Sequence, residues 1–344
     1  MTARLSSAIL RQQGSQLIVV RSVNSLIIVM AQTPPPYGKP EYWDERFKTD
    51  PEPYDWLEGA SILDADINDA LQAHRDNATP PRILHIGSGT SKLSLHLRDF
   101  VKDPAQIQHA DFSAEAVEWG RHQEKNTFGF EWDEGGADKE QLEEYGLVAE
   151  NLQLDMPMMK WTQTSLLSLD SVVSTLSLGG FQIIVDKSCC DAIACASWVT
   201  VPIPYYFKLG STASPSALAR ATDEEAPAFD HDEYSIHPIN LLAIHLALVV
   251  SAGARWLALS FSKDRWPFFP DDDCPDVERQ AQQALPKNLL DAGFPDPAKL
   301  WRMIKKENIS KKTADDHAKV PTSGLQHWIY VLERTEVKLE IRGT

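Results

Sequence analysis

A short apolar run that ends in a glycine-rich turn constrains this chain more than any other feature. The run ILHI, residues 83–86, is followed by Gly87-Ser-Gly89 and then by a helical segment, residues 92–100. Further runs alternate in the same way: strands at 107–110, 151–154, 181–185 and 255–261, and helices at 114–123 and 239–251. Strands that alternate with helices pair in parallel within one sheet. The pattern therefore predicts an α/β fold.

The glycine turn is also the first indication of a bound ligand. Gly87 permits a tight turn, and Gly89 lets the backbone approach a ligand without a side-chain clash. Asp111 closes the next strand, where a carboxylate can accept both hydroxyls of a ribose. Asp111 also suits the start of the following helix as an N-cap, and both roles stay open.

The turn does not suit a phosphate ligand. It lacks the Gly-Lys-Ser/Thr ending of a phosphate loop, and Lys92 stands where a dinucleotide fingerprint has its third glycine. A nucleoside without a pyrophosphate fits better, and S-adenosyl-L-methionine is such a ligand. Asp155 and Met156 follow the predicted strand 151–154, where a carboxylate can accept from the adenine amino group and a methionine can pack on the ring.

Composition excludes other classes of protein. The formal net charge of −16 argues against nucleic-acid binding, which needs a basic surface, and suits a basic partner. The longest apolar segment, residues 239–250, has the length of a buried core helix, so we expect no membrane span. Four cysteines without a second Cys/His pair predict reduced thiols and no metal site.

The first forty residues differ from the rest. They carry three arginines and a lysine but no Asp or Glu, a pattern typical of mitochondrial transit peptides. A start at Met30 is an equally good interpretation of residues 1–29. We therefore predict a disordered or targeting extension over 1–40 and one domain over 41–344. Two segments within it, 126–150 and 200–236, are predicted to be insertions.

Six ordered blocks resemble one family. They are EYWDERF (41–47), PYDWL (53–57), ILHIGSGTSKLS (83–94), HADFSAEAV (109–117), LQLDM (152–156) and FQIIVDKSCCDAI (181–193). In this order they resemble the methyltransferase-like proteins that include the eukaryotic elongation factor 1-alpha lysine methyltransferases, a class I S-adenosylmethionine-dependent family. The resemblance implies a Rossmann-like, seven-stranded, mostly parallel sheet with helices on both faces. Its last strand, residues 327–334, would be antiparallel.

The resemblance also implies the cofactor contacts, residue by residue. Three aromatic residues would cover the methionine moiety, namely Trp43, Phe47 and Trp56. Gly87 would lie against the amino-acid part, and Asp111 and Phe112 at the ribose and adenine. Asp155 and Met156 would lie at the adenine, and Lys187 near the cofactor carboxylate. The chain departs from the family at Ser188-Cys189-Cys190, where the family has Gly-Thr-Leu.

A lysine acceptor would need help in losing its proton. Its reference pKa is roughly 10.4, so only about one side chain in a thousand is neutral at pH 7. Apolar walls lower that pKa and a carboxylate can relay the proton. Asp186 and Asp191, near the end of strand 181–185, are the predicted catalytic residues, with Trp43, Trp266 and Phe268 as apolar walls. For both aspartates a helix N-cap is the competing interpretation.

The predicted function is methylation of a protein lysine, with a translation elongation factor as the leading partner. Two alternatives stay open: a small-molecule methyltransferase on the same fold, and a cofactor-binding scaffold without catalysis. The predicted location is cytoplasmic, or mitochondrial if residues 1–29 are a transit peptide.

Overall fold

The structure of the protein is a computed structural model. It describes residues 9–12, 15–22, 25–31, 35–50, 52–53, 55–128, 158–203, 205–210, 233–269, 277–309 and 326–341. Internal contacts divide the chain into two units, residues 1–37 and 38–344. The first unit contains the antiparallel strands β1 (Ile9–Gln12), β2 (Ser15–Ser22) and β3 (Ser25–Ala31). That residues 1–40 form a disordered or targeting extension stays a prediction.

A seven-stranded sheet forms the centre of the second unit, in the order β12-β13-β11-β7-β4-β5-β6. Its strands are β4 (Ile83–Ile86), β5 (Ile107–Asp111), β6 (Lys160–Gln163), β7 (Phe181–Lys187), β11 (Val250–Ser260), β12 (Trp301–Asn308) and β13 (Trp328–Arg334). Strands β11, β7, β4, β5 and β6 pair in parallel, and β13 pairs antiparallel with β11 and β12. The predicted fold, with an antiparallel strand at 327–334, is confirmed.

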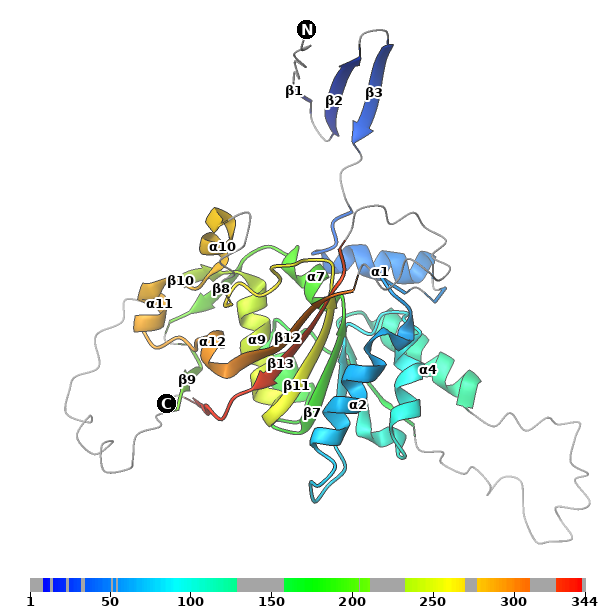
Figure 1. Cartoon of the computed structure of the whole chain (residues 1–344), viewed down its shortest axis with the longest axis vertical. Coiled ribbons are helices and arrows are strands. Elements are labelled where there is room, and N and C mark those ends of the chain that lie inside the picture. Colours follow the sequence, from blue (N-terminus) through cyan, green and yellow to red (C-terminus); the bar gives the residue numbers. More distant parts are fainter. Residues whose placement is uncertain are drawn as a thin grey trace, which may run out of the picture. The chain divides into compact units, whose positions relative to one another are not determined.

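Helices cover both faces of this sheet (Figure 1). One face carries α2 (Asp64–Ala73), α3 (Leu93–His96) and α4 (Ala114–Phe128). The other face carries α6 (Leu169–Thr175), α7 (Cys189–Ala194), α9 (Pro238–Val249), α11 (Lys287–Asp291) and α12 (Pro297–Leu300). The 3-10 helices are η1 (Ala60–Leu63), η2 (Leu97–Phe100) and η3 (Pro104–Gln106), and the remaining helices are α1 (Pro40–Thr49) and α10 (Val277–Gln283).

The strands alternate their side chains between the two layers. In β7, Ile183 and Val185 pack towards α2, whereas Ile184 packs towards α9. Such strands are buried on both faces, so their sequences are continuous apolar runs rather than alternating ones. This explains why ILHI and FQIIV were recognisable in the sequence. Because β4 pairs in parallel with both β5 and β7, the carboxyl ends of these three strands lie together at one edge of the sheet.

Two small antiparallel pairs lie outside the main sheet. Strand β8 (Val199–Pro202) pairs with β10 (Glu233–Ile236), and β9 (Phe207–Leu209) pairs with β14 (Leu339–Ile341). Three of these strands fall within or beside the predicted insertion at 200–236. The predicted insertion at 126–150 begins inside α4, and its remainder lies outside the described residues, as does the predicted strand 151–154.

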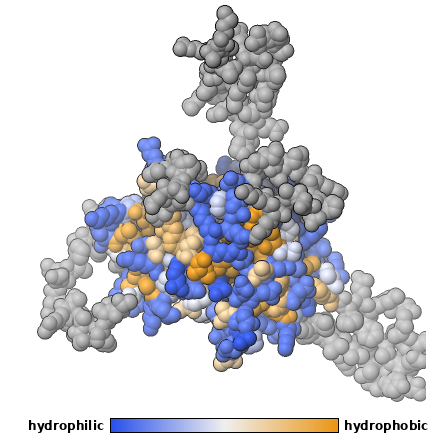
Figure 2. All heavy atoms as spheres, viewed as in Figure 1, coloured by the Kyte–Doolittle hydropathy of each residue, from blue (hydrophilic) through white to orange (hydrophobic). Residues whose placement is uncertain are grey.

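The apolar segment 239–250 forms the buried helix α9, in which nearly every side chain is buried. Within the described part of the chain, no helix has the length and apolar character needed to cross a membrane. Figure 2 shows hydrophobic patches interspersed with hydrophilic surface on the face it displays.

Candidate functional site

The glycine turn joins β4 to α3 with two residues in left-handed backbone conformations. Gly87 has φ of 58° and Gly89 has φ of 48°, a region that glycine adopts without a steric penalty. The Gly87 N–H donates to the Ala110 carbonyl of β5 at 2.8 Å. A Cβ atom at Gly87 would lie 2.5 Å from the Cys189 side chain, so the space beside the turn is already filled there.

Asp111 is tied to this turn by its side chain. Its carboxylate accepts the Gly89 N–H at 2.9 Å and the Ser113 N–H at 2.9 Å, and the residue is only 4% exposed. Burial raises the pKa of the Asp111 carboxyl to about 6, against the lowering effect of these N–H donors. A carboxylate offers about four acceptor sites, and the Phe112 backbone N–H also interacts with this one, so about one site is left for a hydroxyl donor such as that of a ribose. The N-cap of α4 is instead Ser113, whose hydroxyl accepts the Ala116 N–H at 3.4 Å, so Asp111 precedes the cap and the ligand-binding interpretation stays a prediction.

Trp43, Phe47 and Trp56 contact one another beside the turn, and their predicted role over the methionine moiety stays a prediction. The Trp43 ring stacks on Phe47 and lies edge-on to Trp56, with centroids 5.9 Å apart in each pair. A Cβ atom at Gly89 would lie 3.3 Å from Cζ of Phe47, so this ring contacts the turn directly. Helix α1 and the loop after it thus bring an apolar surface to the carboxyl end of β4.

Lys187 ends the central strand β7 and is buried. Its Nζ forms an ion pair of 2.8 Å with Asp55 Oδ1, and its side chain is 2% exposed. The pKa of Lys187 is lowered by burial, against the raising effect of the hydrogen bond and charge of Asp55. Nothing in our sequence analysis singled out Asp55, which is 132 residues away from Lys187.

Asp186 and Asp191 both have internal partners. The Asp186 carboxylate accepts the Cys190 N–H and the Trp256 Nε1–H, each at 3.2 Å, and Asp186 is fully buried. Burial raises the pKa of Asp186 to about 7, and the Asp191 charge adds to the rise. Their catalytic roles stay predictions, but the structure gives each carboxylate contacts that hold the fold.

The Asp191 carboxylate organises the end of β11. It accepts the Ser260 hydroxyl at 2.5 Å and the Phe261 N–H at 3.1 Å, and pairs with Arg265 Nη2 at 2.6 Å. The Arg265 guanidinium lies over the Phe261 ring, 5.3 Å from its centroid. Phe261 is 44% exposed although its backbone N–H and its ring both have partners. It was not predicted, and its only signal in the sequence is its place at the end of an apolar run.

The other two predicted apolar walls lie in the core instead. Trp266 is 2% exposed and packs edge-on against Trp256 and Tyr330, with Phe268 beside it. The expectation that Trp266 and Phe268 line the acceptor side is therefore not supported. Their segment contains a proline, and the rings pack over side chains of β11 and β13 as core residues.

Asp155 and Met156 lie outside the described residues, so their adenine contacts stay predictions. Strand β6, which pairs with β5, ends at Gln163. Its Nε2 donates to the Phe112 carbonyl at 3.0 Å, and the Thr164 N–H donates to the Asp111 carbonyl at 2.7 Å. Gln163 and Thr164 therefore flank Phe112 and Asp111, and neither was predicted.

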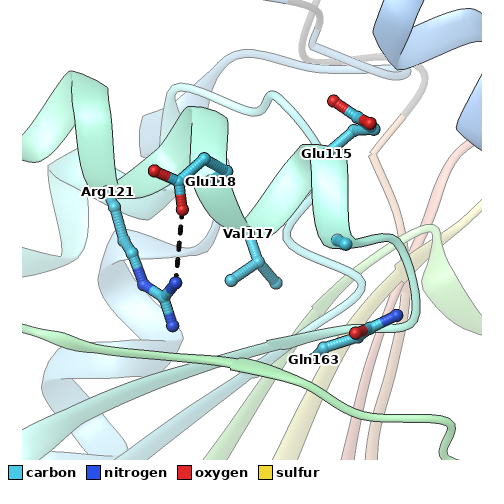
Figure 3. A pocket seen from close by; sticks show the side chains of 6 residues that line it. Glu115, Val117, Glu118, Arg121 and Gln163 are labelled. Atoms are coloured by element: carbon cyan, nitrogen blue, oxygen red, sulfur yellow. Dashed lines mark hydrogen bonds and ion pairs between the residues drawn. The ribbon is translucent and has the colours of Figure 1, made fainter.

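An open hollow of about 400 Å³ lies next to this corner (Figure 3). Residues of α4 and the end of β6 line it: Ala114, Glu115, Val117, Glu118, Arg121 and Gln163. Glu118 and Arg121 form an ion pair of 3.3 Å across its wall. Its lining combines charged and apolar side chains, and it shares Gln163 with the contacts around Phe112.

Of the three cysteines that the structure describes, Cys190 is buried, Cys189 is partly buried and Cys195 is exposed. Burial raises the pKa of the Cys189 and Cys190 thiols well above its usual value, with the Asp186 charge as the next cause. Ser188 has φ of 70° at the position where the resembled family has glycine. Across the described ranges, no group of His, Cys, Asp or Glu could hold a metal ion, and Cys274 lies outside them.

Comparisons with known proteins find methyltransferases. No family model matches the chain. Methyltransferase srdJ of Neurospora crassa is 28% identical over 173 residues, which are 48% of this chain and 59% of that relative's length. Solved structures with a similar fold include the N-methyltransferase NodS from Bradyrhizobium japonicum WM9 with S-adenosyl-L-homocysteine. It is 9% identical, covers 86% of this chain and 99% of its own, and has a TM-score of 0.38.

A second solved structure is geranyl diphosphate C-methyltransferase from Streptomyces coelicolor, which is 9% identical with a TM-score of 0.39. The alignment covers 88% of this chain and 98% of that one. Because both TM-scores are low, the two structures carry no argument about the site. The strand order and the srdJ match together support a class I methyltransferase fold.

Proposed function

We propose that this protein is an S-adenosyl-L-methionine-dependent methyltransferase. The observation that carries the proposal is the hydrogen bond between the Gly89 N–H and the Asp111 carboxylate, at the carboxyl edge of a parallel sheet. Ligands of open α/β sheets bind outside this edge. The aromatic residues Trp43, Phe47 and Trp56 gather at the same place.

The residues present fit this cofactor. Asp111 has an acceptor site left for a ribose hydroxyl, and Ser88 Oγ is buried in the turn with no hydrogen-bond partner among the described residues. The glycine turn would hold the amino-acid part, and Gln163 and Phe112 would lie at the adenine. When bound, the cofactor supplies an activated methyl group. The chain's own residues would then orient it and exclude water.

For the acceptor we propose a protein lysine, with an elongation factor as the leading candidate. Two observations support it: the six blocks that resemble the lysine methyltransferases, and the net charge of −16, which attracts a basic partner. The aromatic edge near Trp43 and the exposed Phe261 supply the apolar surface that lowers the pKa of a lysine.

A small-molecule acceptor is the second candidate, and a specific observation favours it. The carboxylates of Asp186 and Asp191 bind partners within the protein. They are therefore less suited to accept the proton that a lysine acceptor must lose, whereas some small-molecule acceptors have no such need. The Ser188-Cys189-Cys190 segment also replaces the family's residues beside the turn.

The test uses the whole protein and labelled S-adenosylmethionine. Calorimetry measures cofactor binding first, and methyl transfer is then assayed in a cell lysate separated into protein and low-molecular-weight fractions. Label on a lysine of a basic protein supports the first acceptor, and label on a small molecule supports the second. Cofactor binding without any labelled product would leave a scaffold role, and the absence of binding would refute the proposal.

A further inference from the structure

A buried ion pair joins two distant parts of the chain at the edge of the sheet. Lys187 ends β7, which lies between β4 and β11 in the centre of the sheet. Asp55 belongs to the segment between α1 and η1, and its side chain is 20% exposed. The pair therefore fixes an otherwise irregular segment to the strand end nearest the glycine turn.

Asp55 also holds the glycine turn itself. The oxygen that pairs with Lys187, Oδ1, accepts the Ser91 hydroxyl at 2.9 Å. The adjacent Thr90 hydroxyl donates to the Glu52 carbonyl at 3.1 Å, in the same segment. Two successive residues after Gly89 are thus bonded to the segment that carries Trp56. One carboxylate connects the turn, the end of the central strand and the aromatic cluster.

The charge at Asp55 matters because Lys187 is buried. Desolvation disfavours its ammonium, and Asp55 offsets this cost most strongly, through a hydrogen bond and its charge, with a smaller contribution from the charge of Glu58. A lysine ammonium has three N–H donors, of which Asp55 accepts one. With Asp55 in place, the remaining donors have a fixed position next to the turn.

We propose that Asp55 is a positioning residue for the cofactor. It sets the Lys187 ammonium and the Ser91 end of the turn in the geometry that receives the amino-acid moiety, and it draws Trp56 onto that site. This inference rests on the proposed function. It assigns the residue no contact with the reacting methyl group.

The test is an affinity measurement on Asp55→Asn, which keeps the shape and removes the charge. We expect the dissociation constant for S-adenosylhomocysteine, measured by calorimetry, to rise about tenfold or more, because a charged hydrogen bond is lost. The KM for the cofactor should rise in parallel, whereas the acceptor KM should change less than about twofold, since the acceptor does not depend on this bond.

Asp66→Asn is the matched control. Asp66 forms an ion pair of the same length, 2.8 Å, with Lys305 on α2 and β12, away from the carboxyl edge. It should lower the melting temperature and leave cofactor affinity unchanged. Ser91→Ala, which buries no unpaired charge, covers the case in which Asp55→Asn does not fold. It should weaken cofactor binding about tenfold, the lower end of the range for a hydrogen bond to a charged group.

The outcomes separate two failures. If the natural protein binds no S-adenosylhomocysteine, the proposed function fails. If it binds, but both Asp55→Asn and Ser91→Ala bind equally well, the inference is overturned. The inference would also be overturned if kcat fell and both KM values rose by similar factors, together with a lower melting temperature. A merely structural role produces that pattern.

Discussion

Cofactor affinity should depend on pH through Asp111. The carboxyl of this residue has its pKa raised to about 6, chiefly by burial, and it lies where the ribose hydroxyls are expected. Only the ionised carboxylate is acceptor-only, so cofactor binding favours that form. At pH 5, one unit below this pKa, only about one carboxyl in ten is ionised. The affinity should then be roughly tenfold weaker than at pH 8, about 1.4 kcal/mol.

Calorimetry with S-adenosylhomocysteine between pH 5 and 8 measures this dependence. Asp111→Asn cannot ionise, so its affinity should be low at every pH, by about 1.5–3 kcal/mol for the lost charged hydrogen bond, and should not rise with pH. Asp69→Asn, an exposed carboxylate of α2, is the control and should follow the natural profile. A natural protein with pH-independent affinity, or an Asp111→Asn variant that keeps the slope, would contradict the assignment.

The contribution of Asp111 to folding stability should change with pH in the direction opposite to its effect on cofactor binding. Because the folded pKa of about 6 is above the unfolded value of 3.8, the folded state binds more protons between these values. The contribution of Asp111 to the free energy of unfolding is therefore present in full below pH 3.8 and decreases as the pH rises through 6. As the pH falls, protonation of Asp111 thus lowers cofactor affinity while its contribution to stability grows. Unfolding of the protein at low pH would instead lower both.

Three further predictions concern the backbone and the core. Gly87→Ala should lower the melting temperature by several degrees, because φ of 58° is strained for alanine and the new Cβ atom would meet Cys189. Gly59→Ala is the control and should leave the melting temperature unchanged, because its Cβ atom would meet nothing within 4 Å. Ser188→Gly should raise the free energy of unfolding, measured by urea denaturation, by about 1 kcal/mol, because glycine adopts φ of 70° without strain. Burial lowers the pKa of His85 to about 3, so the free energy of unfolding should fall by about 2 kcal/mol between pH 6.5 and 5, and His85→Gln should reduce that slope.

The sheet was predictable because its two central strands contain runs of mostly apolar residues, ILHI in β4 and FQIIV in β7. Both strands are almost wholly buried. β6 is different: it is an edge strand, KWTQ, in which only Trp161 is buried. No hydrophobic run marks such a strand, and its place was therefore not predicted.

The site was predictable only where residues are close in sequence to a strand end. Gly87 and Asp111 follow β4 and close β5, so the order of the strands brings them together. Apart from the Cys190 N–H, the partners of Asp186 and Asp191 come from β11 and the loop after it, about 70 residues away. No local pattern shows such contacts, and two carboxylates at a strand end were therefore interpreted as reactive.

The aromatic segment before β4 is part of the site and not an appendage to it. Gly38 packs so closely on the backbone of Cys195, at the end of α7, that a Cβ atom would lie 2.2 Å from it. Further along, Phe47 contacts the glycine turn and Asp55 holds Lys187. Contacts at Gly38, Phe47 and Asp55 thus tie the described residues of this segment to the edge of the sheet. If the cofactor binds at this edge, as proposed, the same segment would cover it, and closure of the site would then depend on the folding of that segment.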